Sequence, residues 1–393
     1  MATDKRITVT HVGSLVRPPA LIEYLRKIQD GQPFDKAGFE ACLTKSVEDA
    51  VRLQAEAGVD IVSDGEYGKS VNWAFYVHRR LSGLEQRALT PEDMKDPMSR
   101  SLGGRDREAF PEFYAEYDGR VMRNVSAPVR PVVTGPITYT GQAELQHDIA
   151  NLKSGMAKAG VRGFLPVVAP ASALPHAKNE YYRDEDTYLF ALAEALAVEY
   201  RAVIDAGLDV QVDDAFLPYL YEKLVPPMSM AEYRKWAELR IAATNHALKG
   251  IPPERSRYHI CWGSWNGPHM FDLPLKEIVD LVLKVNVGTY SFEAANPRHE
   301  HEWQVWKNVK LPAGKSLMPG VITHSTNIVE HPELVAERLL RFASVVGRDA
   351  VIAGTDCGFS QSPLAGRVHY SIMWAKLKCL AEGAKIASAQ LWH

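Results

Sequence analysis

Eight stretches of the chain share one pattern of hydrophobic and polar positions. Each begins with a short run rich in β-branched residues, continues with a polar or glycine-bearing cluster and connects to a helix-like apolar periodicity. The eight runs cover residues 7–14, 59–66, 129–138, 208–214, 257–263, 287–293, 318–325 and 350–358. A strand followed by a helix, repeated eight times, is the plan of a (β/α)8 TIM barrel. The pattern therefore predicts the α/β class and one barrel domain spanning residues 1–393.

Two segments do not fit the eightfold repeat. A ninth strand-like run, residues 163–170, has no place in a barrel of eight strands, so we interpret residues 142–185 as an insertion. Residues 86–120 are irregular and rich in charge, glycine and proline, which indicates a second insertion after the second strand. Because the loops after the strands build the active site in such barrels, we expect the insertions on that face.

The composition is that of an ordinary globular protein, with a formal net charge of −3 at pH 7 over 393 residues. This charge gives no electrostatic basis for binding nucleic acid, and no apolar run reaches the length of a membrane span. The first residues lack the apolar core of a signal peptide, and four cysteines do not make a disulfide framework in so long a chain. We expect a cytoplasmic protein, and the sequence leaves a homo-oligomer open.

Polar residues gather where the predicted strands end. In a (β/α)8 barrel the carboxyl ends of the strands meet at one mouth, where the active site lies. A single polar strand end is more often a helix cap than a functional group. Here nearly every strand ends in an acid, a histidine or a cysteine, so we expect a functional site built from them. The residues are Ser14, Asp64, Glu66, Thr134, Asp213, Asp214, His259, Cys261, Glu293, His324, Asp356 and Cys357.

Four of these residues have the chemistry of a metal site. His259 and Cys261 lie two positions apart, so on one strand their side chains point to the same side. Glu293 and Cys357 end two other strands, and closure of the barrel would bring them to the same mouth. Two thiolates and an imidazole favour Zn²⁺ over magnesium or calcium. Residue types alone leave equally open that the cysteines are unrelated core residues.

Short motifs at the strand ends match a known family in the family's own order. They are Val-Gly-Ser-Leu at 12–15, Asp-Gly-Glu at 64–66, Thr-Gly-Pro at 134–136, His-Ile-Cys at 259–261, Ser-Phe-Glu at 291–293, Gly-Val-Ile-Thr-His-Ser at 320–325 and Thr-Asp-Cys-Gly at 355–358. Through these motifs nearly the whole chain resembles the catalytic barrel of cobalamin-independent methionine synthases and their relatives. The resemblance implies a barrel of the methionine synthase and uroporphyrinogen decarboxylase type.

The resemblance implies a zinc-dependent S-methyltransferase that methylates homocysteine and so takes part in methionine biosynthesis. By this resemblance Zn²⁺ binds to His259, Cys261, Glu293 and Cys357. A thiol that joins a bound cation loses its proton near neutral pH, and the thiolate is the nucleophile. Glu293 would occupy the position that the incoming thiol takes. His324 would protonate the leaving nitrogen as a general acid.

The partners that the resemblance implies are a small thiol and a methyl or alkyl donor. Ser14, Glu66 and Asp213 would hold the amino-acid head of homocysteine, because carboxylates suit an ammonium and a Gly-Ser turn suits a carboxylate. The tryptophan that packs on folate in the family is missing from residues 137–142. A methylated corrinoid carrier therefore stays open as the donor, beside folate.

Two related barrels remain as alternatives. The chain also resembles epoxyalkane:coenzyme M transferase, which uses the same His-x-Cys and Cys ligands with coenzyme M as the thiol and an epoxide as the electrophile. A sulfonate calls for Arg or Lys. Arg17, Lys69 and Arg298 are candidates, although each such residue is more often a solvated surface charge. The porphyrinogen decarboxylases share the fold and need no zinc. The metal content of the purified protein therefore separates this hypothesis from the two zinc-dependent ones.

Overall fold

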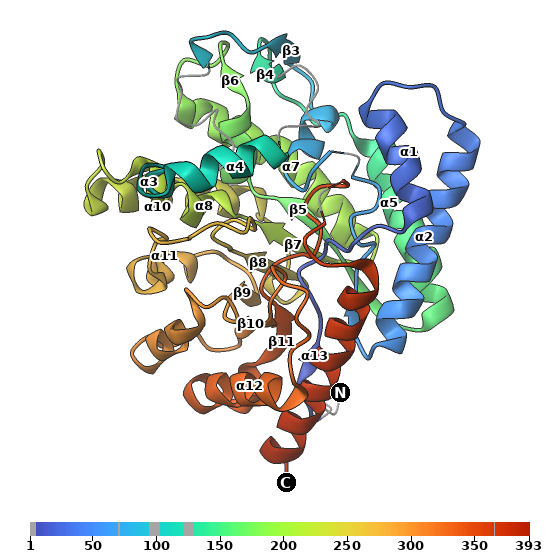
Figure 1. The fold of residues 1–393 in the computed structure, drawn as a ribbon. Helices are drawn as coiled ribbons and strands as arrows, with labels where there is room; N and C mark the ends of the chain where they lie inside the picture. Colours follow the sequence, from blue (N-terminus) through green and yellow to red (C-terminus); the bar gives the residue numbers. More distant parts are fainter. Residues whose placement is uncertain (1–4, 70, 94–102, 122–128, 365) are drawn as a thin grey trace.

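The architecture is a barrel of eight parallel strands. The computed structural model describes residues 5–69, 71–93, 103–121, 129–364 and 366–393 (Figure 1). The strands follow in the order β1, β11, β10, β9, β8, β7, β5 and β2, and a parallel bridge between Thr10 and Ile61 joins the two ends of this series. The prediction of an α/β TIM barrel is confirmed. The barrel strands are β1 (Thr8–Val9), β2 (Ile61–Val62), β5 (Arg162–Val168), β7 (Asp209–Asp213), β8 (Ser256–His259), β9 (Thr289–Glu293), β10 (Ser316–Ile322) and β11 (Ile352–Thr355).

Long helices cover the outside of the barrel, as Figure 1 shows for α1, α2, α12 and α13. Their first turns are held by local side chains: Ser229 and Glu232 form a reciprocal capping box on α10, and Asp184 accepts the Thr187 N–H on α7. The long helices are α1 (Pro19–Gln29), α2 (Lys36–Glu56), α4 (Pro111–Val121), α5 (Gln142–Ala159), α7 (Glu185–Asp205), α10 (Met230–Ala247), α12 (Pro332–Val346) and α13 (Tyr370–Leu391). The short helices are α3 (Arg105–Ala109), α6 (Pro170–Ala173), α8 (Phe216–Tyr219), α9 (Tyr221–Leu224) and α11 (Val279–Val282).

The third barrel strand differs from the prediction. Residues 129–138 were expected in the barrel, but β4 (Val129–Val133) pairs antiparallel with β3 (Leu84–Ala88) and parallel with β6 (Lys178–Asn179) in a separate sheet. The ninth run, expected in an insertion, is β5 and lies between β2 and β7. Six of the seven β5 residues are buried, against two of five in β4. Burial on both faces is what a parallel barrel strand requires.

Because β5 rather than β4 is the third barrel strand, the predicted insertions at 142–185 and 86–120 also change. Residues 142–168 form α5 and β5, a regular helix and strand of the barrel, so the insertion predicted at 142–185 is wrong for that part. The predicted insertion at 86–120 contributes to β3 and contains α3 and α4, and residues 94–102 of it lie outside the described part. Figure 1 shows the β3–β4–β6 sheet at one edge of the molecule. The single domain across 1–393 stays a prediction.

The barrel interior mixes polar and apolar side chains. Arg257 on β8 lies over the Phe164 ring with 3.4 Å between the guanidinium carbon and the ring centroid. Gln211 on β7 donates to the Val12 carbonyl and, at 2.7 Å, to Asp213. All five of these residues are at least nine-tenths buried. A polar column therefore runs beneath the mouth. Among the described residues, no helix has the length and apolar character that crossing a membrane requires.

Candidate metal centre and active site

Three of the four predicted metal ligands meet at the mouth. His259 is the last residue of β8, Cys261 follows two positions later, and Cys357 lies two positions after the end of β11. One ligand atom from each lies within 4.8 Å of the others, and the two sulfurs are 3.8 Å apart. All three side chains are buried. Within the described part of the chain, this is the one group of three or more His, Cys, Asp or Glu residues that could hold a metal ion.

The imidazole of His259 is oriented for ligation. Its Nδ1 lies 3.0 Å from the Ser291 hydroxyl, while its Nε2 is buried without a hydrogen-bond partner in the described residues. Burial, with the charge of Arg257, lowers the pKa of His259 to about 3, so the ring is neutral. A neutral ring fixed at one nitrogen and open at the other is the form in which histidine binds a metal.

Glu293 ends β9 beside the cluster but is not a member of the group of three. Its two oxygens accept hydrogen bonds from the Trp262 N–H at 3.2 Å and from the Asn296 amide at 2.8 Å. Burial raises the pKa of Glu293. The two hydrogen bonds therefore hold this buried carboxylate next to Trp262, the residue that follows Cys261.

His324 follows β10 at the same mouth and is 4% exposed. Among the described residues neither of its ring nitrogens has a hydrogen-bond partner. Burial, together with the charge of Arg367, lowers the pKa of His324 well below its usual value, so the ring is neutral in the free protein. A buried histidine without a hydrogen bond at either nitrogen is unfavourable in free energy unless a ligand supplies a partner.

Glu66 already has a cationic partner. Its carboxylate lies 2.7 Å from the Lys69 ammonium, and both side chains are under 10% exposed. Lys69 also donates to the Pro166 carbonyl at 3.0 Å and lies 4.1 Å from the centroid of the Tyr76 ring. The backbone of Glu66 is left-handed, with φ of 58°, a conformation that costs a non-glycine residue about 1–2 kcal/mol. Lys69 therefore fixes the position of the carboxylate, and the backbone of Glu66 is strained.

The other two predicted binding residues lie on neighbouring loops and strands. Asp213 accepts from Gln211, and burial together with the charge of Glu66 raises the pKa of Asp213 well above its usual value. The Ser14 hydroxyl accepts the Ser360 N–H at 3.4 Å and leaves no room for a side chain at Gly358, whose Cβ would lie 2.1 Å from it. Ser14 is thus packed directly against the loop that carries Cys357.

Some of the predicted polar residues are held by hydrogen bonds within the fold or lie outside the barrel. Asp214 is held by the hydroxyls of Tyr258 and Ser172, both at 2.7 Å. Thr134 lies at the end of β4, outside the barrel. Arg17 and Lys69 are not solvated surface charges: each is at least nine-tenths buried, and Arg17 donates to backbone carbonyls.

Residues around the cluster that sequence reasoning missed come from distant segments. Trp73 packs against Cys261 and Cys357, and its ring stacks on Phe216 at 6.0 Å. Arg367 is held by Gln361, whose amide also lies 3.7 Å from the Cys357 sulfur. Neither Trp73 nor Arg367 belongs to a strand, so periodicity gives no signal for them.

A buried chain of acids and histidines supports the Trp262 side of the site. His299 stacks on the Trp262 ring at 3.7 Å and is hydrogen-bonded to Asp272 at 3.0 Å and Glu302 at 2.8 Å. His269 contacts the same Asp272 carboxylate at 3.0 Å. Although burial lowers the pKa of His299, its bonds to Asp272 and Glu302 raise it to about 9. The site is therefore backed by a positive charge close to Glu293.

The barrel and the His259–Cys261–Cys357 group define a TIM-barrel protein with a candidate metal centre at its mouth. The fold is the one found in a solved B12-independent methionine synthase from Shewanella sp. W3-18-1 in complex with selenomethionine. The two chains are 20% identical with a TM-score of 0.70, over 98% of this chain and 99% of the other. No protein-family model matches the chain.

Sequence relatives point the same way. The chain is 27% identical over 387 residues to a 2-hydroxypropyl-CoM lyase from Xanthobacter autotrophicus, covering 90% of this chain and 88% of the relative. It is 23% identical over 360 residues to a methionine synthase from Sulfolobus acidocaldarius, covering 91% and 87%. The expected resemblance to cobalamin-independent methionine synthases and to a coenzyme M enzyme is confirmed.

Proposed function

We propose that the protein is a zinc-dependent enzyme that transfers a methyl or other alkyl group to a thiol, with homocysteine as the acceptor and methionine as the product. The observation that carries the proposal is the buried group of His259, Cys261 and Cys357, whose ligand atoms lie within 4.8 Å of one another. The unpartnered Nε2 of His259 and two soft sulfur donors fit Zn²⁺. The relatives named methionine synthase support the acceptor.

The chain's own residues would prepare the thiol. Bound Zn²⁺ would lower the pKa of a thiol that ligates it, so that the thiolate is present at neutral pH. Ser291 would keep His259 in the tautomer that ligates through Nε2. Glu293 lies beside the cluster on bonds to Trp262 and Asn296, which makes it the candidate for the position that the thiol takes.

His324 is proposed to handle the proton of the leaving group. In the free protein burial, together with the charge of Arg367, lowers the pKa of His324 and keeps its ring neutral. An anionic thiolate nearby would oppose the charge of Arg367 and let the ring take up a proton. The ring would then donate that proton to the atom that leaves when the methyl carbon is attacked. A folate nitrogen needs such a proton in order to leave, whereas a methylated corrinoid leaves without one.

Asp213, Glu66 and Ser14 are proposed to bind the amino-acid head of homocysteine. Burial and Glu66 hold the pKa of Asp213 high, so an arriving ammonium would find a carboxyl group that ionises once it has a partner. The same ammonium would compete with Lys69 for Glu66. Ser14 lies against Gly358, in the loop that carries Cys357.

A second acceptor class has one specific observation in its favour. The Lys69 ammonium lies buried beside Glu66, so the site contains a cation as well as carboxylates. An ammonium of this kind suits the sulfonate of a coenzyme M-like thiol, and one relative is named for 2-hydroxypropyl-CoM. Under this alternative Lys69 binds the anionic end of the thiol.

The test combines metal analysis with a choice of acceptor. The purified protein should contain about one zinc per chain with sulfur and nitrogen ligands in X-ray absorption. Homocysteine should then be methylated faster than coenzyme M with either methyltetrahydrofolate or methylcobalamin as donor. Full activity in metal-free protein would end the zinc proposal, and preference for coenzyme M would replace the acceptor while leaving the zinc chemistry in place.

A further inference from the structure

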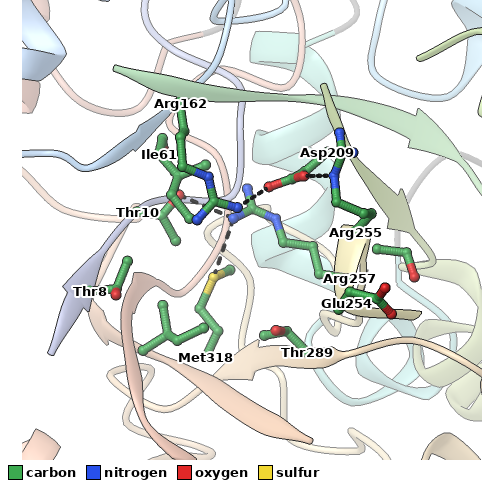
Figure 2. Close-up of a pocket in the computed structure, with 12 residues that line it drawn as sticks. Thr8, Thr10, Ile61, Arg162, Asp209, Glu254, Arg255, Arg257, Thr289 and Met318 are labelled. Carbon is green, nitrogen blue, oxygen red and sulfur yellow. Dashed lines mark hydrogen bonds and ion pairs between the residues drawn. The ribbon is translucent and has the colours of Figure 1, made fainter. Parts of the chain in front are cut away.

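Figure 2 shows the residues that line a second site, a cavity of about 190 Å³. This cavity lies at the end of the barrel opposite the metal centre. The cluster is at the carboxyl ends of the strands, whereas the cavity is lined by residues at or near the amino ends of seven of them. These are Thr8, Ile61, Arg162, Asp209, Ser256, Thr289 and Ile352, the first residues of β1, β2, β5, β7, β8, β9 and β11. The cavity is therefore distinct from the active-site mouth.

Three guanidinium groups line this cavity. Asp209 is shared by two of them: it accepts from Arg162 at 2.9 Å and from Arg255 at 2.5 Å, as Figure 2 shows. Arg257 is the third, and the remaining acidic lining residue, Glu254, is exposed. The lining thus contains three guanidinium groups and two carboxylates, and the Asp209 carboxylate is already paired with Arg162 and Arg255.

Arg257 forms no ion pair with a carboxylate within the part of the chain that the structure describes. Its side chain is 7% exposed, and it donates at 3.1 Å to the Thr10 hydroxyl and at 2.9 Å to the His11 carbonyl. Its Nε is buried without any hydrogen-bond partner among the described residues. Burial lowers the pKa of this guanidinium to about 9, although the charges of Asp213 and Asp209 act on it without an ion pair. A buried cation without a direct anionic partner is costly, and an anion beside it would offset that cost.

We propose that this cavity binds a small tetrahedral oxyanion such as phosphate. The guanidinium groups offer the planar, forked donors that phosphate oxygens accept, and the hydroxyls of Thr8 and Thr289 add neutral donors around them. The cavity has room for such an anion, since each water of the liquid occupies only about 30 Å³. The anion joins the first residues of several strands, so it secures the lower end of the barrel. The proposal does not depend on the reaction at the mouth.

Phosphate binding to the purified zinc-loaded protein tests the proposal. Equilibrium dialysis with labelled phosphate, at ionic strength kept constant with chloride, should show one saturable site per chain. Arg162→Gln removes a side chain that is 69% exposed, so the fold is retained, and phosphate binding should weaken about fivefold or more. Thr289→Val should weaken it by a smaller factor. Thermal melts of both variants check that they are folded.

The matched control is Arg183→Gln, which removes an arginine that is 85% exposed and paired with Asp184 away from the cavity. This variant should bind phosphate as the wild type does. The proposal is overturned if the wild type shows no saturable phosphate site. It is equally overturned if Arg162→Gln and Thr289→Val both bind phosphate as tightly as Arg183→Gln, because the anion would then bind elsewhere and the cavity would hold only water.

Discussion

Replacing Ser291 by alanine should weaken zinc binding without removing any zinc ligand. Ser291 is 1% exposed, and its hydroxyl lies 3.0 Å from the Nδ1 of His259. When Nε2 ligates zinc, Nδ1 carries the hydrogen and needs an acceptor. The alanine variant leaves that N–H buried and unpaired in the zinc-bound state. In the metal-free state the neutral ring can carry its hydrogen on either nitrogen, so the variant is not restricted to that tautomer.

The magnitude follows from that difference between the two states. An unpaired buried donor costs about 1–3 kcal/mol, which corresponds to roughly 5–150-fold in affinity. Losing a group that orients a metal-bound histidine typically costs 10–100-fold. We therefore expect the zinc dissociation constant of Ser291→Ala to rise about tenfold or more. Competition with a chromophoric chelator at fixed pH measures that constant directly.

The control is Ser388→Ala, which removes another buried hydroxyl far from the cluster. Ser388 donates to the Ala384 carbonyl at 2.6 Å and accepts the Ile7 N–H at 2.9 Å. It should lower the melting temperature and leave zinc affinity unchanged. If Ser291→Ala holds zinc within twofold of the wild type, then Ser291 does not orient His259 and the ligation assigned to Nε2 is wrong.

Four further predictions concern the site and its support. Cys261→Ser should lose zinc in metal analysis, whereas Cys379→Ser should keep it. Lys69→Met removes the partner of Glu66, so the KM for homocysteine should fall if the ammonium of homocysteine binds to Glu66. A higher KM for homocysteine, together with loss of coenzyme M binding, would favour an anionic thiol. His324→Asn should slow single-turnover methyl transfer about 100-fold with a folate donor while zinc stays bound. The pKa of His299 is raised to about 9 in the folded protein from 6.5, so its stabilisation is full below pH 6.5 and is lost towards pH 9. Melting curves of His299→Gln should lack that loss.

Each of these results has an outcome that would contradict it. Zinc retained by Cys261→Ser would remove that thiolate from the ligand set. Unchanged homocysteine and coenzyme M kinetics in Lys69→Met would place both thiols away from Glu66. Equal slowing of His324→Asn with folate and corrinoid donors would assign the ring to shaping the pocket. Parallel melting curves of wild type and His299→Gln from pH 6.5 to 9 would show that the ring is not charged in the folded protein.

The sequence alone determined the barrel class, and its family resemblance named the three residues that meet in the cluster together with Glu293, which is not a member of that group. Apolar runs that alternate with helical periodicity are local signals, so seven of the eight barrel strands could be placed from them. The spacing of His259 and Cys261 is also local, since residues two apart on a strand share a side. The sulfur of Cys357 was assigned to the same mouth because every strand of such a barrel ends there.

Only the tertiary structure decided which strand came third and what surrounds the cluster. Residues 129–138 and 163–170 carry the same local β signal, and the choice between them depends on which run can bury both faces between β2 and β7. The spacing of residues in the sequence reveals neither the pairing of Glu66 with Lys69 nor the burial of Arg257 without an ion pair. Burial, desolvation and the partner of a charge depend on segments far apart in the chain, and a sequence pattern records only neighbours.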